Sequence, residues 1–146
     1  MRDVPDRFDG WVRAGLDALR AELPWGYAAM CEALGAREVL ITVSGQPAAV
    51  RCDGARATVS AEVARPAVTL RATAAEVVAL ADGERTIAEA VIDGRVVMRG
   101  EVDDLLAAHD ALVAFVRGAV RAPSFAWRLD AFRQWAAARD AARGER

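Results

Sequence analysis

The chain has 146 residues, of which 54% are hydrophobic, and a formal net charge of −2. This length is typical of a single domain with one core. Strong binding to nucleic acid usually requires an excess of basic residues, because phosphate contacts dominate that affinity, so the charge balance argues against a nucleic-acid partner. The first residues lack the apolar stretch of a secretion signal, and no apolar run approaches the ~18 residues of a transmembrane segment. We expect one cytoplasmic domain over residues 1–146.

The two cysteines, Cys31 and Cys52, have neither the spacing of a zinc site nor that of a redox pair. A disulfide between them is one alternative, and two buried free thiols in a reducing cytosol is the interpretation that we favour. The motifs of hydrolases, zinc proteases and nucleotide-binding loops are missing. The sequence therefore predicts no metal and no cofactor.

The N-terminal region is predicted to be helical. Within residues 5–23 the apolar positions recur at helical spacing and are separated by arginine and aspartate. These positions are Phe8, Val12, Leu16 and Leu19. Pro24 ends the pattern, and a second, shorter helix is expected over residues 25–34, closed by Gly35.

Residues 39–72 change to an alternation of apolar and polar side chains, which is typical of strands with one buried and one wet face. The alternation covers four short segments. Their apolar positions are Val39, Ile41 and Val43; Val50 and Cys52; Val59, Ala61 and Val63; and Val68 and Leu70. The connections are short and rich in turn residues, which predicts an antiparallel sheet that helices cover on one side only.

Two capping boxes follow the strands, Thr73-Ala-Ala-Glu76 and Thr86-Ile-Ala-Glu89. In a capping box the threonine hydroxyl and the glutamate carboxylate reciprocally satisfy free amides at the start of a helix. Two short helices are therefore expected, the first ending at Gly83 and the second at Asp93-Gly94.

A fifth strand is expected over residues 95–100, and a long helix from Asp103 to about Val120. Pro123 breaks that helix, and Ser124 can cap a last one. Its apolar face is predicted to hold Phe125, Leu129, Phe132 and Ala136.

Few residues are candidates for catalysis. His109 is the only histidine, and Asp110 beside it could orient it as a base. A boundary residue without a catalytic role is the interpretation that we favour. Glu101, Asp103 and Asp104 could share protons or bind a cation, but acids at a helix start also complement its dipole and cap its amides. His109, Asp104 and Glu101 are the only catalytic candidates, and we expect none of them to catalyse a reaction.

Residues 80–101 resemble the signature of the sterol carrier protein type-2 family. In that family a helix ends in glycine, and a short helix, a second glycine, a strand and a Gly-Asp step follow. The matching positions here are Leu80, Gly83, Gly94, Val96, Met98, Gly100 and Glu101, with glutamate in place of the usual aspartate. The resemblance spans about residues 25–120. It implies an α+β fold, in which a five-stranded antiparallel sheet is covered on one face by helices and an apolar cavity lies between them.

The resemblance also implies which residues contact a ligand. The walls of the tunnel would be Val77, Leu80, Ile87, Val91, Leu105, Leu112 and Phe115. A C-terminal segment often closes the tunnel in this family, so residues 121–146 are the candidate lid. Its ligand-facing residues would be Phe125, Trp127, Leu129 and Phe132. The last helix is longer and more basic than is usual in the family.

The expected function is non-catalytic binding or carriage of an apolar small molecule, such as a fatty acyl chain or a sterol-like or polyketide-like molecule. One alternative is a cofactor-free cyclase or isomerase that uses the same pocket and accelerates its reaction by positioning. Another is an interaction module, whose basic, aromatic last helix docks on a membrane surface or a partner protein. Packing of that helix on the domain is the simpler interpretation. The oligomeric state is not predicted.

Overall fold

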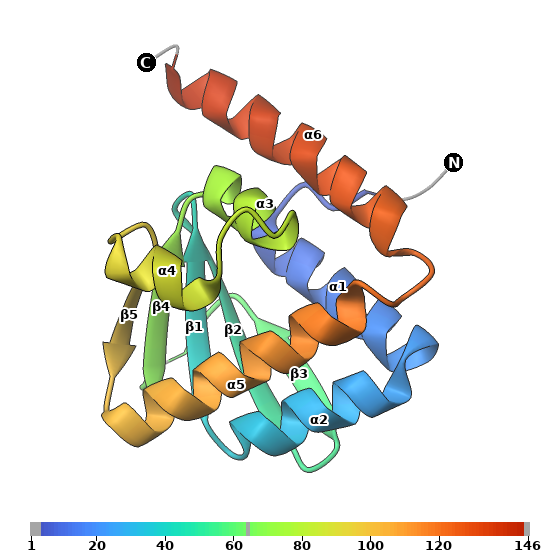
Figure 1. The fold of residues 1–146 in the computed structure, drawn as a ribbon, viewed down its shortest axis with the longest axis vertical. Coiled ribbons are helices and arrows are strands. Elements are labelled where there is room, and N and C mark those ends of the chain that lie inside the picture. The colour runs from blue at the N-terminus through green and yellow to red at the C-terminus, as the bar shows by residue number, and fades with distance from the viewer. Residues whose placement is uncertain (1–3, 64, 145–146) are drawn as a thin grey trace.

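A five-stranded sheet forms the centre of the molecule, and helices pack against one of its faces (Figure 1). The computed structural model describes residues 4–63 and 65–144. The elements in chain order are α1 (Phe8–Glu22), α2 (Pro24–Leu34), β1 (Glu38–Val43), β2 (Gln46–Asp53), β3 (Arg56–Ser60), β4 (Val68–Ala72), α3 (Ala74–Ala81), α4 (Ile87–Ile92), β5 (Val97–Gly100), α5 (Val102–Ala119) and α6 (Phe125–Gly144). The predicted α+β class and the one-sided helical cover are confirmed.

The sheet is mixed, and the prediction of a purely antiparallel sheet was wrong. The strand order is β3-β2-β1-β4-β5, and β1 pairs antiparallel with β2 but parallel with β4. The prediction failed because it assumed that a short connection always joins neighbouring strands. The link of residues 61–67 can span roughly 20 Å at ~3.3 Å per residue. That length lets the chain pass β2 and β1, so that β4 pairs on the far side of β1.

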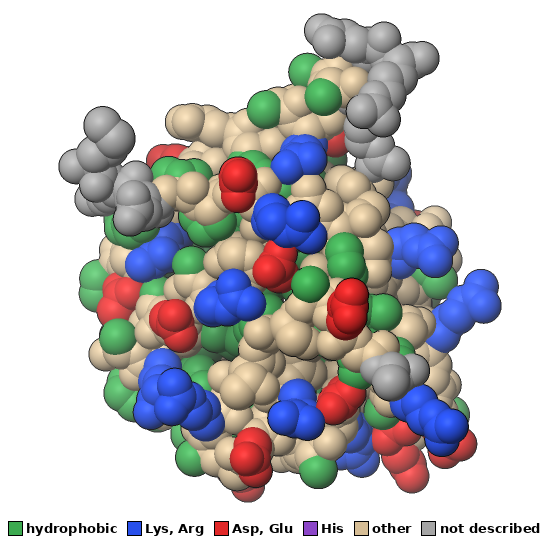
Figure 2. All heavy atoms as spheres, turned by 180° about the vertical axis from the view of Figure 1, so that it is seen from behind, with side chains coloured by type: hydrophobic (Ala, Val, Ile, Leu, Met, Phe, Trp, Pro, Cys, Tyr) green, Lys and Arg blue, Asp and Glu red, His purple; other side chains and the backbone are tan. Residues whose placement is uncertain are grey.

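The alternation along the strands decides which face of the sheet is buried, because successive side chains point to opposite faces. Val43 and Val68 face the helices, and each has an exposed fraction of 0%. Arg51 and Arg71 occupy alternate positions and are exposed. The rear view in Figure 2 shows arginine and acidic side chains interspersed on the side away from the labelled helices. The apolar side chains of the strands therefore point into the space between the sheet and the helices.

Both capping boxes begin a helix, and in each the threonine acts as predicted. Thr73 Oγ1 accepts a hydrogen bond from the Glu76 amide, and Thr86 Oγ1 accepts one from the Glu89 amide, each at 3.1 Å. The Glu76 carboxylate does not complete its box. It accepts instead from Arg85 Nε at 2.6 Å, and its side chain is buried. This ion pair ties α3 to the loop that leads into α4.

Two glycines let α2 and α5 pack closely. A Cβ on Gly26 would lie 3.2 Å from the Gly118 Cα, and one on Gly118 would lie 2.6 Å from Leu19 Cδ1. A side chain at either position would therefore force the neighbouring atoms to shift. Within the described ranges, no helix is both long and apolar enough to cross a membrane.

Gly100 ends β5 at a point where a side chain has no room. A Cβ there would lie 2.7 Å from the carbonyl oxygen of Ala67 and 3.3 Å from Val68 Cγ2. Because backbone must shift to make space, we expect Gly100→Ala to lower the free energy of unfolding by about 1–3 kcal/mol, measured by chemical denaturation. Gly54→Asn is the control, since a Cβ there meets nothing within 4 Å and asparagine tolerates its φ of 64°. Equal stability of the two variants would contradict the prediction.

Candidate functional site

An apolar cavity of about 330 Å³ lies between the sheet and the helices. Its floor is the buried face of the sheet, and residues from all six helices form its walls, with Met30 and Leu34 contributed by α2. The floor residues include Val39, Ile41, Val43, Val50, Leu70 and Ala72. At ~30 Å³ for each group of the size of a water molecule or a methylene, the volume holds about eleven such groups.

Small residues on the helices leave this space open. Those that line the cavity are Gly15, Ala18, Ala81, Ala108, Ala111 and Ala119, and Ala122 adds another small side chain from the loop after α5. A methyl group or a hydrogen atom cannot fill the gap that a leucine would fill, and protein interiors otherwise leave few voids larger than a water molecule. The cavity therefore follows from the alanine-rich composition together with the one-sided cover of the sheet.

Most of the predicted ligand-contacting residues lie together on this cavity. Those that line it are Val77, Leu80, Ile87, Leu112, Phe115, Phe125, Leu129 and Phe132. Val91 lies elsewhere, with an exposed fraction of 37%, because it is on the outer side of the short helix α4. Leu105 packs in the core beside Gly100, and Trp127 lies under the Arg128 guanidinium, whose central carbon is 4.4 Å from its ring centroid.

The contribution of α1 to the cavity wall was not predicted from the sequence. Trp11, Leu16 and Leu19 line the cavity, together with Phe8 and Val12. The signal was present, because these residues include the apolar stripe that predicted the helix. The stripe was not predicted to contact a ligand, because the resemblance begins near residue 25 and implied nothing about the residues before it.

The candidates for catalysis, Glu101, Asp104 and His109, lie outside the cavity. His109 Nδ1 lies 3.5 Å from Asp110 Oδ1, and Asp110 is exposed. Glu101 is the N-cap residue of α5, but its side chain makes no capping hydrogen bond. Asp104 accepts a hydrogen bond from Arg37 Nε at 2.7 Å. The carboxylate of Asp104 thus joins the start of α5 to the link between α2 and β1, a role that the predicted capping did not include.

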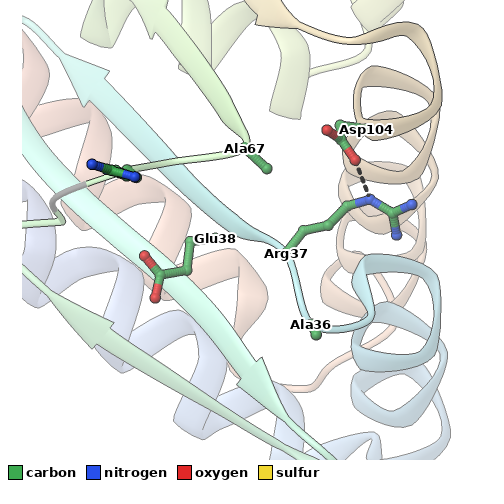
Figure 3. A pocket seen from close by; sticks show the side chains of 6 residues that line it. Ala36, Arg37, Glu38, Ala67 and Asp104 are labelled. Carbon is green, nitrogen blue, oxygen red and sulfur yellow. Dashed lines mark hydrogen bonds and ion pairs between the residues drawn. The ribbon is translucent and has the colours of Figure 1, made fainter.

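A second hollow lies on the surface around that ion pair, and Figure 3 shows it from close by. Its volume is about 540 Å³, and it is lined by Ala36, Arg37, Glu38, Arg65, Ala67 and Asp104. It is open to solvent, and its two arginines balance its two acids. The apolar cavity between sheet and helices is less open to solvent and is therefore the stronger candidate for a ligand site.

The cavity has a polar end where α1 meets α6. Ser124 Oγ donates a hydrogen bond to Glu22 Oε2 at 2.5 Å, and the Ser124 amide donates to Glu22 Oε1 at 2.7 Å. Arg128 Nε donates to Ser124 Oγ at 2.9 Å. The Ser124 hydroxyl holds the pKa of Glu22 below its ordinary value, and the Ser124 amide and the Arg128 charge act in the same direction, while burial opposes them. Ser124 and Arg128 both line the cavity.

Helix α6 is fastened over the cavity by aromatic and polar contacts with the N-terminal region. Trp11 packs edge-on against Phe132 with 5.4 Å between ring centroids, and Trp135 lies 6.2 Å from Trp11. Trp135 Nε1 donates to the backbone oxygen of Asp6 at 3.0 Å. An ion pair between Arg133 and Asp82 joins α6 to the residue that follows α3.

The two cysteines are buried free thiols, as expected. Burial raises the pKa of the Cys52 thiol to about 12, and a hydrogen bond with Cys31 adds to the effect. A thiol with so high a pKa is a poor nucleophile at neutral pH. In the described part of the chain, no three histidine, cysteine or acidic side chains gather as they would to hold a metal ion.

The hydrogen bonds to Glu22 should make the stability of the protein depend on pH. A carboxylate whose pKa is lowered in the folded state stabilises the fold above its unfolded pKa, near 4.5, and loses that contribution as the pH falls through its folded pKa. We therefore expect Glu22→Gln to destabilise the protein at neutral pH, and the difference from the wild type to shrink below a pH of about 4.5. Denaturant unfolding across this range measures it. Ser124→Ala should weaken the same pH dependence, and a difference that stays constant with pH would contradict the assignment.

Comparison with known proteins places the fold among the sterol carrier proteins. No protein-family model matches the chain, and no curated protein matches it in sequence. Among solved structures, a UbiJ-SCP2 ubiquinone synthesis protein shares 16% identity at a TM-score of 0.55, covering 78% of this chain and 95% of its own. The sterol carrier protein domain 2 of Helicoverpa armigera shares 15% at a TM-score of 0.57, covering 79% and 94%. A crystal structure of sterol carrier protein 2 shares 14% at 0.56, covering 78% and 96%.

Proposed function

From a chain with the sterol carrier protein fold, we propose a non-catalytic binding protein or carrier that holds one apolar small molecule between its sheet and its helices. The observation that carries this proposal is the cavity of about 330 Å³. Its walls are almost entirely aliphatic and aromatic, and a pocket with such walls and a few polar groups is typical of ligand sites. The names of the similar structures, sterol carriers and a ubiquinone synthesis protein, support an apolar ligand.

The cavity suits a molecule with a chain or ring system of about eleven non-hydrogen atoms, at ~30 Å³ for each. A longer molecule requires side chains to move or part of the ligand to leave the cavity. Helix α6 serves as the cover on one side, because its residues Phe125, Leu129 and Phe132 line the cavity. Catalysis in the same cavity gains no support from the candidate acids and base, because Glu101, Asp104 and His109 lie outside it.

Filling the cavity should abolish binding. Ala111 is buried on α5 and lines the cavity, and a leucine in its place adds three carbon atoms, which removes roughly 90 Å³ at ~30 Å³ each. We expect Ala111→Leu to lower the affinity for decanol at least about tenfold, because a close-packed site cannot accept both groups. Calorimetric titration of the full chain measures the affinity, and native mass spectrometry of gently purified protein reports any molecule that remains bound.

The matched control is Ala28→Leu, the same substitution at an exposed position of α2 that does not line the cavity. Its affinity for decanol should equal that of the wild type, and thermal unfolding of all three proteins checks that they are folded. The proposed function fails if no apolar molecule co-purifies and decanol does not bind up to its solubility limit. It also fails if Ala111→Leu, still folded, binds decanol as the wild type does.

A further inference from the structure

One hydrogen-bond donor beside the cavity has no acceptor. The indole Nε1 of Trp11 is buried and finds no hydrogen-bond partner among the described residues, and Trp11 lines the cavity. Leaving a buried donor unsatisfied costs roughly 1–3 kcal/mol, so buried donors in folded proteins are nearly always paired. The neighbouring tryptophan on α6 shows the usual arrangement, since Trp135 Nε1 donates to a backbone oxygen.

A second donor group, the guanidinium of Arg128, lines the same cavity. Helices α1 and α6 run antiparallel, because Ser124 meets Glu22 at one end of the pair and Phe132 meets Trp11 further along. Arg128 lies between these two contacts, one helical turn or about 6 Å before Phe132. Its Nε is used on Ser124, and stacking on Trp127 orients the guanidinium. The polar groups of the cavity thus gather between α1 and α6, away from the sheet.

The charge of Arg128 is already balanced. Glu22 is joined to Arg128 through the Ser124 hydroxyl, and the two carry opposite charges. A carboxylate that approached Arg128 would add a second negative charge close to Glu22, which is already linked to Arg128 through Ser124, and like charges disfavour each other. An uncharged oxygen can accept a hydrogen bond without disturbing this balance.

Resting on the proposed function, we infer that the ligand carries an uncharged oxygen acceptor, such as a ketone, ester or hydroxyl oxygen, which binds between α1 and α6. Trp11 Nε1 supplies the hydrogen bond to this oxygen, and the pairing of Arg128 with Glu22 makes the cavity a poor site for a carboxylate. The apolar part of the ligand then extends over the valines and leucines of the sheet. Between α1 and α6 the site selects ligands by their polar group, and over the sheet it selects them only by the size and shape of their apolar part.

Three probes of matched size test this specificity: methyl nonyl ketone, decanoic acid and dodecane. They have equal numbers of non-hydrogen atoms and differ only in the polar group. At neutral pH and equal free concentration, native mass spectrometry of the full chain measures occupancy. We expect the ketone to bind about threefold to tenfold more tightly than dodecane, as one hydrogen bond allows, and about tenfold more tightly than decanoate, because the charged group meets Glu22.

Two substitutions separate the roles. Trp11→Phe keeps an aromatic ring but removes the donor, so the affinity for the ketone should fall about threefold to tenfold while that for dodecane stays constant. Glu22→Gln removes the balancing charge, so the affinity for decanoate should rise about tenfold through Arg128 while that for the ketone changes little. Trp25→Phe, at an exposed tryptophan outside the cavity, is the control and should change nothing.

The outcomes distinguish this inference from the proposed function. If none of the three probes binds, the carrier function itself fails. If all three bind equally, or if Trp11→Phe and Glu22→Gln leave the preferences unchanged, the carrier function stands and the polar end assigned here is wrong. Tighter binding of decanoate than of the ketone to the wild type would likewise overturn it. Preferences are compared within one protein, so a general loss of stability in a variant does not imitate them.

Discussion

The fold depends on the burial of one face of a five-stranded sheet by helices whose facing residues are small. Valine and leucine on the sheet must leave water, and each buried side chain of this size contributes about 1.5–3 kcal/mol. The helices that cover them present alanine and glycine at positions such as Ala108, Ala111 and Gly15. Packing is therefore complete where α2 and α5 cross at Gly26 and Gly118, and incomplete further along. The cavity is the space that this incomplete packing leaves unfilled.

The two ends of the chain complete the cavity. Residues of α1 and α6 meet across 102 positions of sequence at Glu22 and Ser124, and again where Trp11 packs against Phe132. The polar side chains of the wall come from these two ends of the chain, Trp11 from α1 and Ser124 and Arg128 from the start of the α6 segment, while the sheet side is aliphatic. In the proposed carrier, α6 therefore both covers the ligand and contributes hydrogen-bonding groups beside it.

The elements that local chemistry specifies were the ones predicted best. Thr73 and Thr86 cap their helices as the sequence indicated, because a capping hydrogen bond joins residues only three positions apart. The partner of Glu76 was not predictable in the same way. Its carboxylate binds Arg85 across nine positions and a change of direction in the chain. The parallel pairing of β1 with β4 was not predicted for a similar reason. No local sequence signal distinguishes a short hairpin connection from a connection that crosses to the far side of the sheet.

The sequence by itself determined the elements, the buried face of each strand and the apolar stripes of the helices, because periodicity and caps act over a few residues. Through the resemblance to the sterol carrier family it also indicated part of the cavity wall, eight residues from Val77 to Phe132. Only the tertiary structure decided the strand order, the part played by α1 and the chemistry at the polar end. Trp11 of α1 and Arg128 of α6 lie far apart in the chain, and no local pattern relates them. They line one cavity because of how two helices pack over one sheet, which is a property of the tertiary structure.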